Sequence, residues 1–161
     1  MQTSNKIDLV NPVRRQLIVS LVLAAPALST RAAAEQVMIE VWKDPSCGCC
    51  KDWVKHLQAN GFKVKINDSG NTEARARLGM PIQYAACHTG EVGGYAIEGH
   101  VPAREIRRLL KERPTAVGLS VPGMPRGAPG MDDPAYGQER DHYDVFLVHQ
   151  DGSVRVYQSY H

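Results

Sequence analysis

Residues 36–61, QVMIEVWKDPSCGCCKDWVKHLQANG, contain the stretch that decides the predicted fold. Apolar side chains alternate with others along 36–44 and predict a β-strand. Asp44-Pro45-Ser46 ends this strand and offers capping side chains. Residues 50–61 then place apolar side chains at helical spacing, and Gly61 ends the helix. Three cysteines therefore lie where a strand passes into a helix.

The segments on either side extend this pattern towards a thioredoxin-like domain. The predicted elements are a strand at 62–66, a helix at 70–79, strands at 80–87 and 91–99, and a helix at 102–114. Pro81 enters the third strand, and Gly93-Gly94 bends the fourth. The order β-α-β-α-β-β-α is typical of thioredoxin-like proteins, in which the proline at this position is cis and faces the cysteine motif.

The chain changes character after Pro114. Residues 115–141 are rich in proline and glycine, show little periodicity and predict a long loop. Strands at Tyr143–Val148 and Val154–Tyr157 then predict a hairpin that turns at Asp151-Gly152. The predicted fold class is α/β: a thioredoxin-like mixed sheet flanked by helices, with a C-terminal Pro/Gly-rich loop and a β-hairpin extension.

The N-terminal residues have the layout of a bacterial secretory signal. Arg14 and Arg15 precede an apolar run at 17–28, and small residues end at Ala34. A retained anchor is the alternative, but the run is shorter than the roughly 20 residues of a spanning helix. We expect a signal peptide at 1–34, by the Sec or the twin-arginine route, and a single metal-binding domain at 35–161.

Removal of the signal changes the charge of the chain. It takes away four basic residues and one acidic residue, so the net charge falls from +2 to −1. No basic footprint remains, and a nucleic-acid partner is not expected. The mature chain is also expected to have no stable membrane span and to lie in the periplasm.

The four cysteines favour a chemical role over a structural disulfide framework. Cys47, Cys49 and Cys50 are crowded together and only Cys87 is distant, so at most one long-range bridge is possible. A helix start lowers the pKa of a thiol and makes thiolate available. Cys47 and Cys50 have the spacing of a redox motif, which leaves Cys49 surplus to that function.

Metal binding gives the surplus cysteine a role. Thiolates select soft ions such as Cu(I), zinc or iron–sulfur clusters, and crowded thiolates that bridge ions suit a multinuclear Cu(I) site. Cys87 is expected to join the cluster from the end of the third strand. Three further candidate ligands, each with packing as its alternative, are His88, Met124 and Met131.

The remaining histidines are expected to have other roles. His100 is expected to cap or hydrogen-bond near the last helix, and His56 to be solvated on the polar side of the first helix. The C-terminal segment holds three more, which are expected on the surface: His142, His149 and His161.

Three stretches resemble the CopG-type family of exported bacterial copper-resistance proteins, formerly a domain of unknown function. They are CGCCKDWVKHLQANGF, LGMPIQYAACHTGEVGGYAIEGHVP and GLSVPGMPRGAPGM, and the likeness runs from about Val37 to the C-terminus. The resemblance implies a thioredoxin-like fold, a periplasmic location and copper bound through the cysteine motif. Met80 departs from the family, whose members often have valine before the proline.

The leading hypothesis is therefore a periplasmic protein that binds copper for copper resistance, with Cu(I)/Cu(II) redox activity as a secondary hypothesis. Copper ions and other periplasmic copper-handling proteins are its expected partners. A thiol–disulfide oxidoreductase that uses Cys47 and Cys50 is the alternative. A structural zinc site formed by the four cysteines is a third interpretation.

Overall fold

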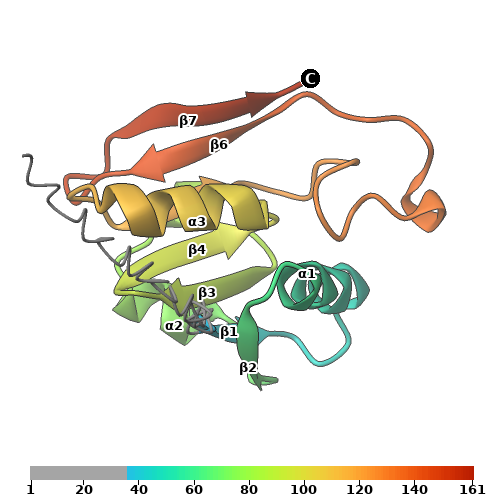
Figure 1. Cartoon of the computed structure of the whole chain (residues 1–161), viewed down its shortest axis with the longest axis horizontal. Coiled ribbons are helices and arrows are strands. Elements are labelled where there is room, and N and C mark those ends of the chain that lie inside the picture. The colour runs from blue at the N-terminus through green and yellow to red at the C-terminus, as the bar shows by residue number, and fades with distance from the viewer. Residues whose placement is uncertain (1–35) are drawn as a thin grey trace, which may run out of the picture. The chain divides into compact units, whose positions relative to one another are not determined.

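The computed structural model describes residues 36–161, which form a seven-stranded mixed sheet with helices on its faces (Figure 1). The strands are β1 (Met38–Lys43), β2 (Lys63–Asn67), β3 (His88–Val92), β4 (Tyr95–Gly99), β5 (Gly118–Val121), β6 (Tyr143–Val148) and β7 (Val154–Tyr160). The helices are α1 (Gly48–Ala59), α2 (Thr72–Arg77) and α3 (Ala103–Glu112), with 3-10 turns η1 (Ile82–Tyr84) and η2 (Pro134–Tyr136).

The strand order is β2-β1-β3-β4-β5-β6-β7. The pairs β1–β2 and β4–β5 are parallel, because a helix crosses over between their strands, and the other neighbours are antiparallel. The predicted order β-α-β-α-β-β-α is observed from β1 to α3. The mixed α/β class and the terminal hairpin are therefore confirmed, and the thioredoxin-like arrangement is compatible with this order.

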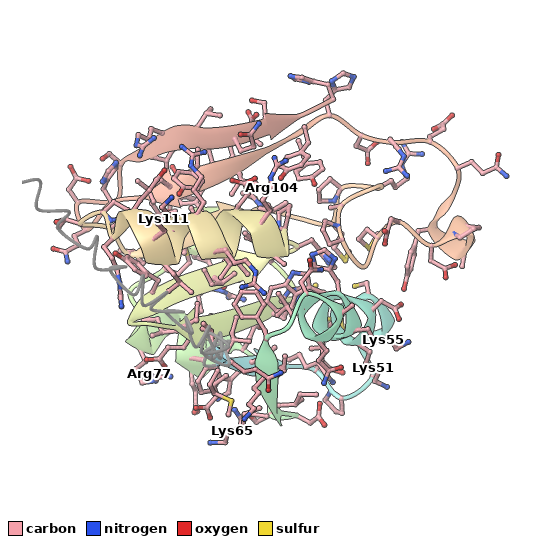
Figure 2. All side chains as sticks on the ribbon, in the orientation of Figure 1. Lys51, Lys55, Lys65, Arg77, Arg104 and Lys111 are labelled. Carbon is pink, nitrogen blue, oxygen red and sulfur yellow. A yellow bond between two sulfur atoms is a disulfide. The ribbon has the colours of Figure 1, made fainter. Side chains whose placement is uncertain are left out.

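The main core lies between the sheet and the pair of helices α1 and α3. Trp53 and Leu57 of α1 and Ile106 of α3 are fully buried against sheet side chains such as Ile97. The other sides of these helices are polar: Lys51 and Lys55 project from α1, and Arg104 and Lys111 from α3 (Figure 2). Burial of the apolar stripe fixes the direction of α1 and hence the position of its cysteine-bearing first turn.

The prediction of a strand at 80–87, entered through a cis Pro81, is wrong. This segment forms the turn η1, and no peptide bond within 36–161 is cis. Met80 is buried with Ala96 and Val148 on the second face of the sheet, while the side chain of Ile82 is 74% exposed. The apolar residues of this segment lie in a short 3-10 turn, so their side chains do not alternate between two faces as they would in a strand.

The prediction of one bent strand at 91–99 is also wrong. Gly93 and Gly94 both have positive φ and form the two-residue turn between β3 and β4. The third strand thus begins at His88 and the fourth at Tyr95. Two glycines with φ > 0 suit the tight turns that join antiparallel strands.

The predicted loop at 115–141 contains an unexpected strand. Residues 118–121 form β5, which pairs with β4 on one side and β6 on the other. All four residues are buried. The true loop, residues 122–142, leaves β5, passes near the first turn of α1 and returns to β6 (Figure 1).

The predicted signal peptide, residues 1–34, lies outside the described residues. Between residues 36 and 161, no helix is both long enough and apolar enough to span a bilayer.

Candidate metal centre

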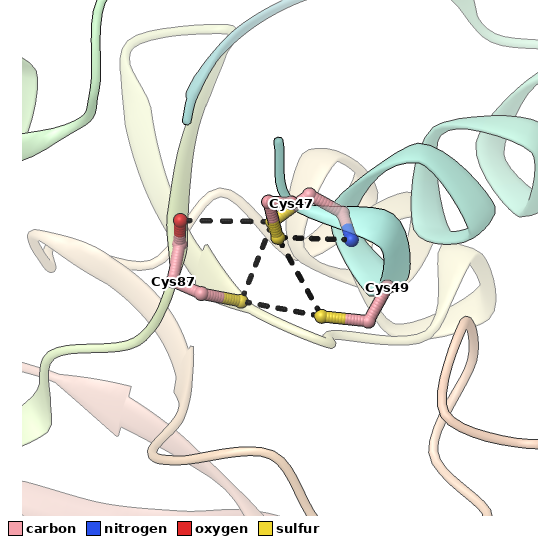
Figure 3. A group of neighbouring side chains, drawn as sticks. Cys47, Cys49 and Cys87 are labelled. Atoms are coloured by element: carbon pink, nitrogen blue, oxygen red, sulfur yellow. Dashed lines mark hydrogen bonds between the residues drawn. A yellow bond between two sulfur atoms is a disulfide. The ribbon is translucent and has the colours of Figure 1, made fainter. Parts of the chain in front are cut away.

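The four cysteine sulfurs form one cluster between the start of α1 and the start of β3 (Figure 3). All four Sγ atoms lie within 4.8 Å of one another. Cys49 Sγ is 3.6 Å from Cys47 Sγ and 3.9 Å from Cys87 Sγ, and Cys50 Sγ is 3.5 Å from Cys87 Sγ. The sequence-based placement of Cys87 beside the CxCC motif agrees with this geometry.

Cys47 and Cys50 are joined by a disulfide, whereas Cys49 and Cys87 are free thiols. Cys47 is the N-cap of α1, and its sulfur accepts the backbone N–H of Cys50 at 3.3 Å. Burial, and next the neighbouring Cys49, raises the pKa of Cys87 to about 12. Cys87 therefore keeps its proton at neutral pH unless a cation takes the place of that proton.

His88 is the first residue of β3 and is fully buried beside Cys87. Its Nδ1 lies 3.3 Å from Cys87 Sγ, and its Nε2 lies 3.0 Å from the carbonyl oxygen of Gly99. A carbonyl only accepts, so Nε2 carries the ring proton and Nδ1 presents a lone pair to the cluster. Burial lowers the pKa of His88, which keeps the ring neutral.

His100 reaches the same cluster, contrary to the expectation that it only caps or hydrogen-bonds near a helix. Its Nε2 lies 3.6 Å from Cys87 Sγ, and its Nδ1 lies 2.9 Å from the carbonyl oxygen of Pro129. The same tautomer argument leaves the Nε2 lone pair facing the sulfur. Ligand atoms of Cys87, His88 and His100 lie within 4.8 Å of one another.

The β3–β4 register explains why His100 lies beside Cys87. This register can be derived from the sequence. Thr89 pairs with Glu98, so two residues further along the hairpin Cys87 comes opposite His100. Both residues are equally far from Gly93-Gly94. If the two glycines are taken as a two-residue hairpin turn, their position alone pairs Cys87 with His100.

The two candidate methionines occupy different environments in the 122–142 loop. The side chain of Met124 is 55% exposed, and its sulfur lies 3.9 Å from Cys49 Sγ. Met131 is buried in an apolar cluster with Cys49, Cys50 and Ala128. Met124 thus stands at the open side of the sulfur cluster, and Met131 contributes to its apolar cover.

Contacts at two points hold the loop over the first turn of α1. The carbonyl oxygen of Pro129 accepts a hydrogen bond from His100, and next to it Gly130 passes so close that an added Cβ would lie 2.5 Å from the backbone nitrogen of Trp53. At the base of the loop, the guanidinium of Arg126 binds the carboxylate of Asp141 at 2.6 Å. The 122–142 loop thereby covers one side of the cysteine cluster.

A buried polar network fixes the backbone before Cys87. The carboxylate of Glu98 accepts the N–H of Ala86 at 2.7 Å, the hydroxyl of Thr89 at 2.6 Å and Nε of Arg75 at 2.9 Å. Arg75 also donates to the carbonyl oxygen of Ala86 at 3.0 Å. Both the N–H and the carbonyl oxygen of Ala86 are thus hydrogen-bonded. They fix the backbone directly before Cys87.

The other histidines show one further departure from the predictions. His56 is half-buried, and its Nε2 accepts the backbone N–H of Ala103 at the start of α3. It therefore links α1 to α3, although solvation was expected. His142 and His161 are exposed, as expected, but their Nδ1 atoms lie 2.8 Å apart.

The comparisons with known proteins agree on one family. Residues 84–131 match a family model described as "Protein of unknown function, DUF411". A solved structure of copper resistance protein CopG, form 2, is 45% identical with a TM-score of 0.72, and the match covers 79% of this chain and 100% of that one. Form 1 of that protein is 46% identical with a TM-score of 0.71, over 78% and 98%. No curated protein matches the chain.

Proposed function

The chain belongs to the CopG family of copper resistance proteins, and from this premise we propose that it binds Cu(I) through its four cysteines for copper resistance. The observation that carries the proposal is that four cysteine sulfurs lie within 4.8 Å of one another. They come from two separate elements, the first turn of α1 and the start of β3, so the fold itself gathers them. The fold therefore positions the four cysteine side chains where a soft cation could bind them.

The spacing and type of the donors fit copper-sized ions. Two sulfurs on one tetrahedral ion, at a metal–sulfur distance near 2.3 Å, lie about 3.8 Å apart. The shortest distances between sulfurs that are not bonded to each other are 3.5, 3.6 and 3.9 Å, and reduction of the Cys47–Cys50 disulfide would free the remaining pair. Soft thiolates select Cu(I), and four sulfurs so close can each bridge two ions. We therefore propose a site for more than one Cu(I).

The neighbouring imidazoles support the same site. The free lone pairs of His88 and His100 face the sulfur of Cys87, and backbone carbonyls fix both tautomers. Second-shell hydrogen bonds of this kind orient the histidines of metal sites. Met124 adds an exposed thioether beside Cys49, a donor that suits Cu(I) and that zinc disfavours. A structural zinc site would give the thioether of Met124 no role.

The disulfide gives the site an oxidised form with fewer donors. While Cys47 and Cys50 are bonded, only Cys49 and Cys87 offer thiols. Reduction by two electrons and two protons would restore all four. Export through residues 1–34 to the periplasm, an oxidising compartment, remains part of the proposal and makes this redox state relevant. Copper that cycles between Cu(I) and Cu(II) would exchange electrons with the same thiols.

The test is anaerobic Cu(I) titration of the reduced protein lacking residues 1–34, against a chromophoric chelator. The unmodified chain should take up more than one Cu(I), and Cys49→Ala should lose most of that capacity. Met38→Leu, which removes an exposed thioether outside the cluster, is the matched control and should leave uptake unchanged. Equal uptake by Cys49→Ala and the unmodified chain would refute the proposal.

A thiol–disulfide oxidoreductase is the second candidate, favoured by the disulfide between Cys47 and Cys50. Such an enzyme needs an accessible thiolate and a resolving partner, and it has no use for Cys49. Cys49→Ala therefore separates the two functions. Disulfide exchange that survives this substitution, in a protein that never binds Cu(I), would establish the enzyme instead.

A further inference from the structure

A second cluster of donors lies at the open end of the β6–β7 hairpin. Tyr143 pairs with Tyr160 in the antiparallel register, so His142 and His161, one residue further out, stand directly opposite each other. Their Nδ1 atoms are 2.8 Å apart, and both side chains are exposed. We call these two residues the histidine pair.

The strand pattern puts a carboxylate on the same face of the hairpin as the histidine pair. Side chains two apart on a strand share a face, so Asp144 lies on the same face as His142. Its carboxylate accepts a hydrogen bond from the hydroxyl of Ser159, the residue on the same face of β7. Tyr143 and Tyr160 stack on the opposite face with ring centres 4.8 Å apart and pack against the main core. The hairpin end is thus braced on one face and carries donors on the other.

We infer that the histidine pair is a second metal site, separate from the cysteines, which binds a divalent cation of borderline softness and fits Cu(II) best. Two imidazole nitrogens bound at 2.0–2.1 Å lie about 2.9 Å apart when they meet the ion at a right angle, and about 3.3 Å apart in a tetrahedron. The observed 2.8 Å is the length of a hydrogen bond between the two rings, and it is close enough to the right-angle spacing that a bound ion would need only a small shift of the rings. Tetragonal sites with N and O donors are typical of Cu(II) and Ni(II), and Cu(II) binds more tightly.

The pair can receive the ion with little rearrangement. Without a cation, one Nδ1–H donates to the other Nδ1, and a tautomer change that moves this proton to Nε2 frees both lone pairs. Arg126 beside this edge is already paired with Asp141 and Glu139, which limits its repulsion of a cation.

This inference does not depend on the proposed function, because the two sites differ in donors. Thiolates select Cu(I), whereas imidazole and carboxylate accept Cu(II). Failure of one site leaves the other unaffected, and separate substitutions test each.

The experiment is Cu(II) titration of the untagged protein, followed by electron paramagnetic resonance, in a Cys49→Ser/Cys87→Ser background that cannot reduce the ion through free thiols. We expect one axial signal with coupling to two nitrogens. His142→Ala and His161→Ala should each weaken Cu(II) binding by roughly tenfold or more and remove the two-nitrogen pattern. His149→Ala, a histidine at the other end of the same hairpin, is the matched control and should change neither.

A second measurement tests the same site in the unmodified protein, without any substitution. Substoichiometric Ni(II) should broaden the imidazole proton resonances of His142 and His161 before those of His149. An unchanged Cu(II) spectrum in His142→Ala and His161→Ala, or broadening that affects His149 first, would overturn the inference.

Discussion

Gly130 shows at the scale of one residue how tightly the loop is fitted over the cysteine cluster. Its φ is +81°, which other residues adopt only with strain, and an added Cβ would lie 2.5 Å from Trp53 N and 2.8 Å from the carbonyl oxygen of Cys49. Both atoms belong to the backbone of α1, so they cannot rotate away. A side chain here would push the loop from the helix that carries the sulfurs.

Gly130→Ala should therefore lower both stability and copper retention. We expect a loss of more than about 1–3 kcal/mol in the free energy of unfolding, which is the range for backbone strain alone. Urea denaturation measures this loss, and chelator competition measures retention. Gly123→Ala, in the same loop with φ +73° and open space around it, is the control for strain without contact. Equal losses in the two variants would show that the contact with α1 is unimportant.

Single residues also mark what the sequence could predict about the site. The crowding of Cys47, Cys49 and Cys50 predicted a thiol cluster that Cys87 would join, and the four sulfurs do lie together, while their role as ligands stays a prediction. His100 was missed, because a histidine before a helix has many local explanations, and only the hairpin register brings it opposite Cys87. The pairing of His142 with His161 depends on the same kind of non-local register.

At the scale of elements, the link between α1 and α3 should respond to pH. His56 accepts the N–H of Ala103 and so satisfies a donor at the start of α3. Burial lowers the pKa of His56, while Asp132 opposes this shift. A histidine whose folded-state pKa lies below its unfolded value stabilises the fold above the unfolded pKa. That contribution is lost as the pH falls through the folded pKa, because protonated Nε2 no longer accepts.

His56→Gln should reduce this pH dependence, because an amide offers an acceptor that does not titrate. Between pH 7 and pH 5 we expect the unmodified chain to lose about 0.5–2 kcal/mol, the usual value of an N-terminal cap, and the variant to lose less. Urea denaturation across this range measures both. An identical pH profile for the two proteins would contradict the role of His56.

The segment 85–89 depends on the ion pair between Arg75, in the last turn of α2, and Glu98 of β4. The side chain of Glu98 is fully buried and that of Arg75 is 10% exposed. Glu98→Gln leaves a buried guanidinium without its counter-charge, which typically costs about 3–5 kcal/mol. We expect that loss in urea denaturation, with weaker Cu(I) binding because Cys87 follows the clamped Ala86. Glu91→Gln, which breaks the more exposed pair with Arg77, should cost less than about 1 kcal/mol.

The elements also show why the fold was only partly predictable. The amphipathic helices and the strands β1, β2 and β6 follow from periodicity. The strand β5 has four residues in a glycine- and proline-rich stretch, and its stability comes from hydrogen bonds to β4 and β6, which no local pattern reveals. At 80–87 an apolar stretch suggested a strand, but burial of Met80 and the hydrogen bond from Ser120 to the carbonyl oxygen of Tyr84 favour a turn.

At the scale of the whole molecule, the proposed copper site and the fold depend on the same elements. The cluster joins the first turn of α1 to the start of β3, and the loop that covers it is held by His100 after β4. Any ion bound by Cys49 and Cys87 therefore ties these elements together. A ligand that binds only the folded state stabilises it by mass action, and the size of the effect depends on how many donors are available.

Redox state should thus control how far Cu(I) stabilises the protein. In the reduced form four thiols can bind, and free Cu(I) at 1,000 times its Kd would add about 4 kcal/mol. For a domain of this size, we expect the Tm to rise by roughly 10 °C. In the form with the Cys47–Cys50 disulfide, only two thiols remain, and the rise should be much smaller. Anaerobic calorimetry of both forms, with and without Cu(I) held by a chelator, measures the difference. Cys87→Ser in the reduced form should also show a smaller rise than the unmodified reduced protein, because it removes the sulfur that links β3 to α1. If Cu(I) raised the Tm of the oxidised and reduced forms equally, Cys47 and Cys50 would not be ligands.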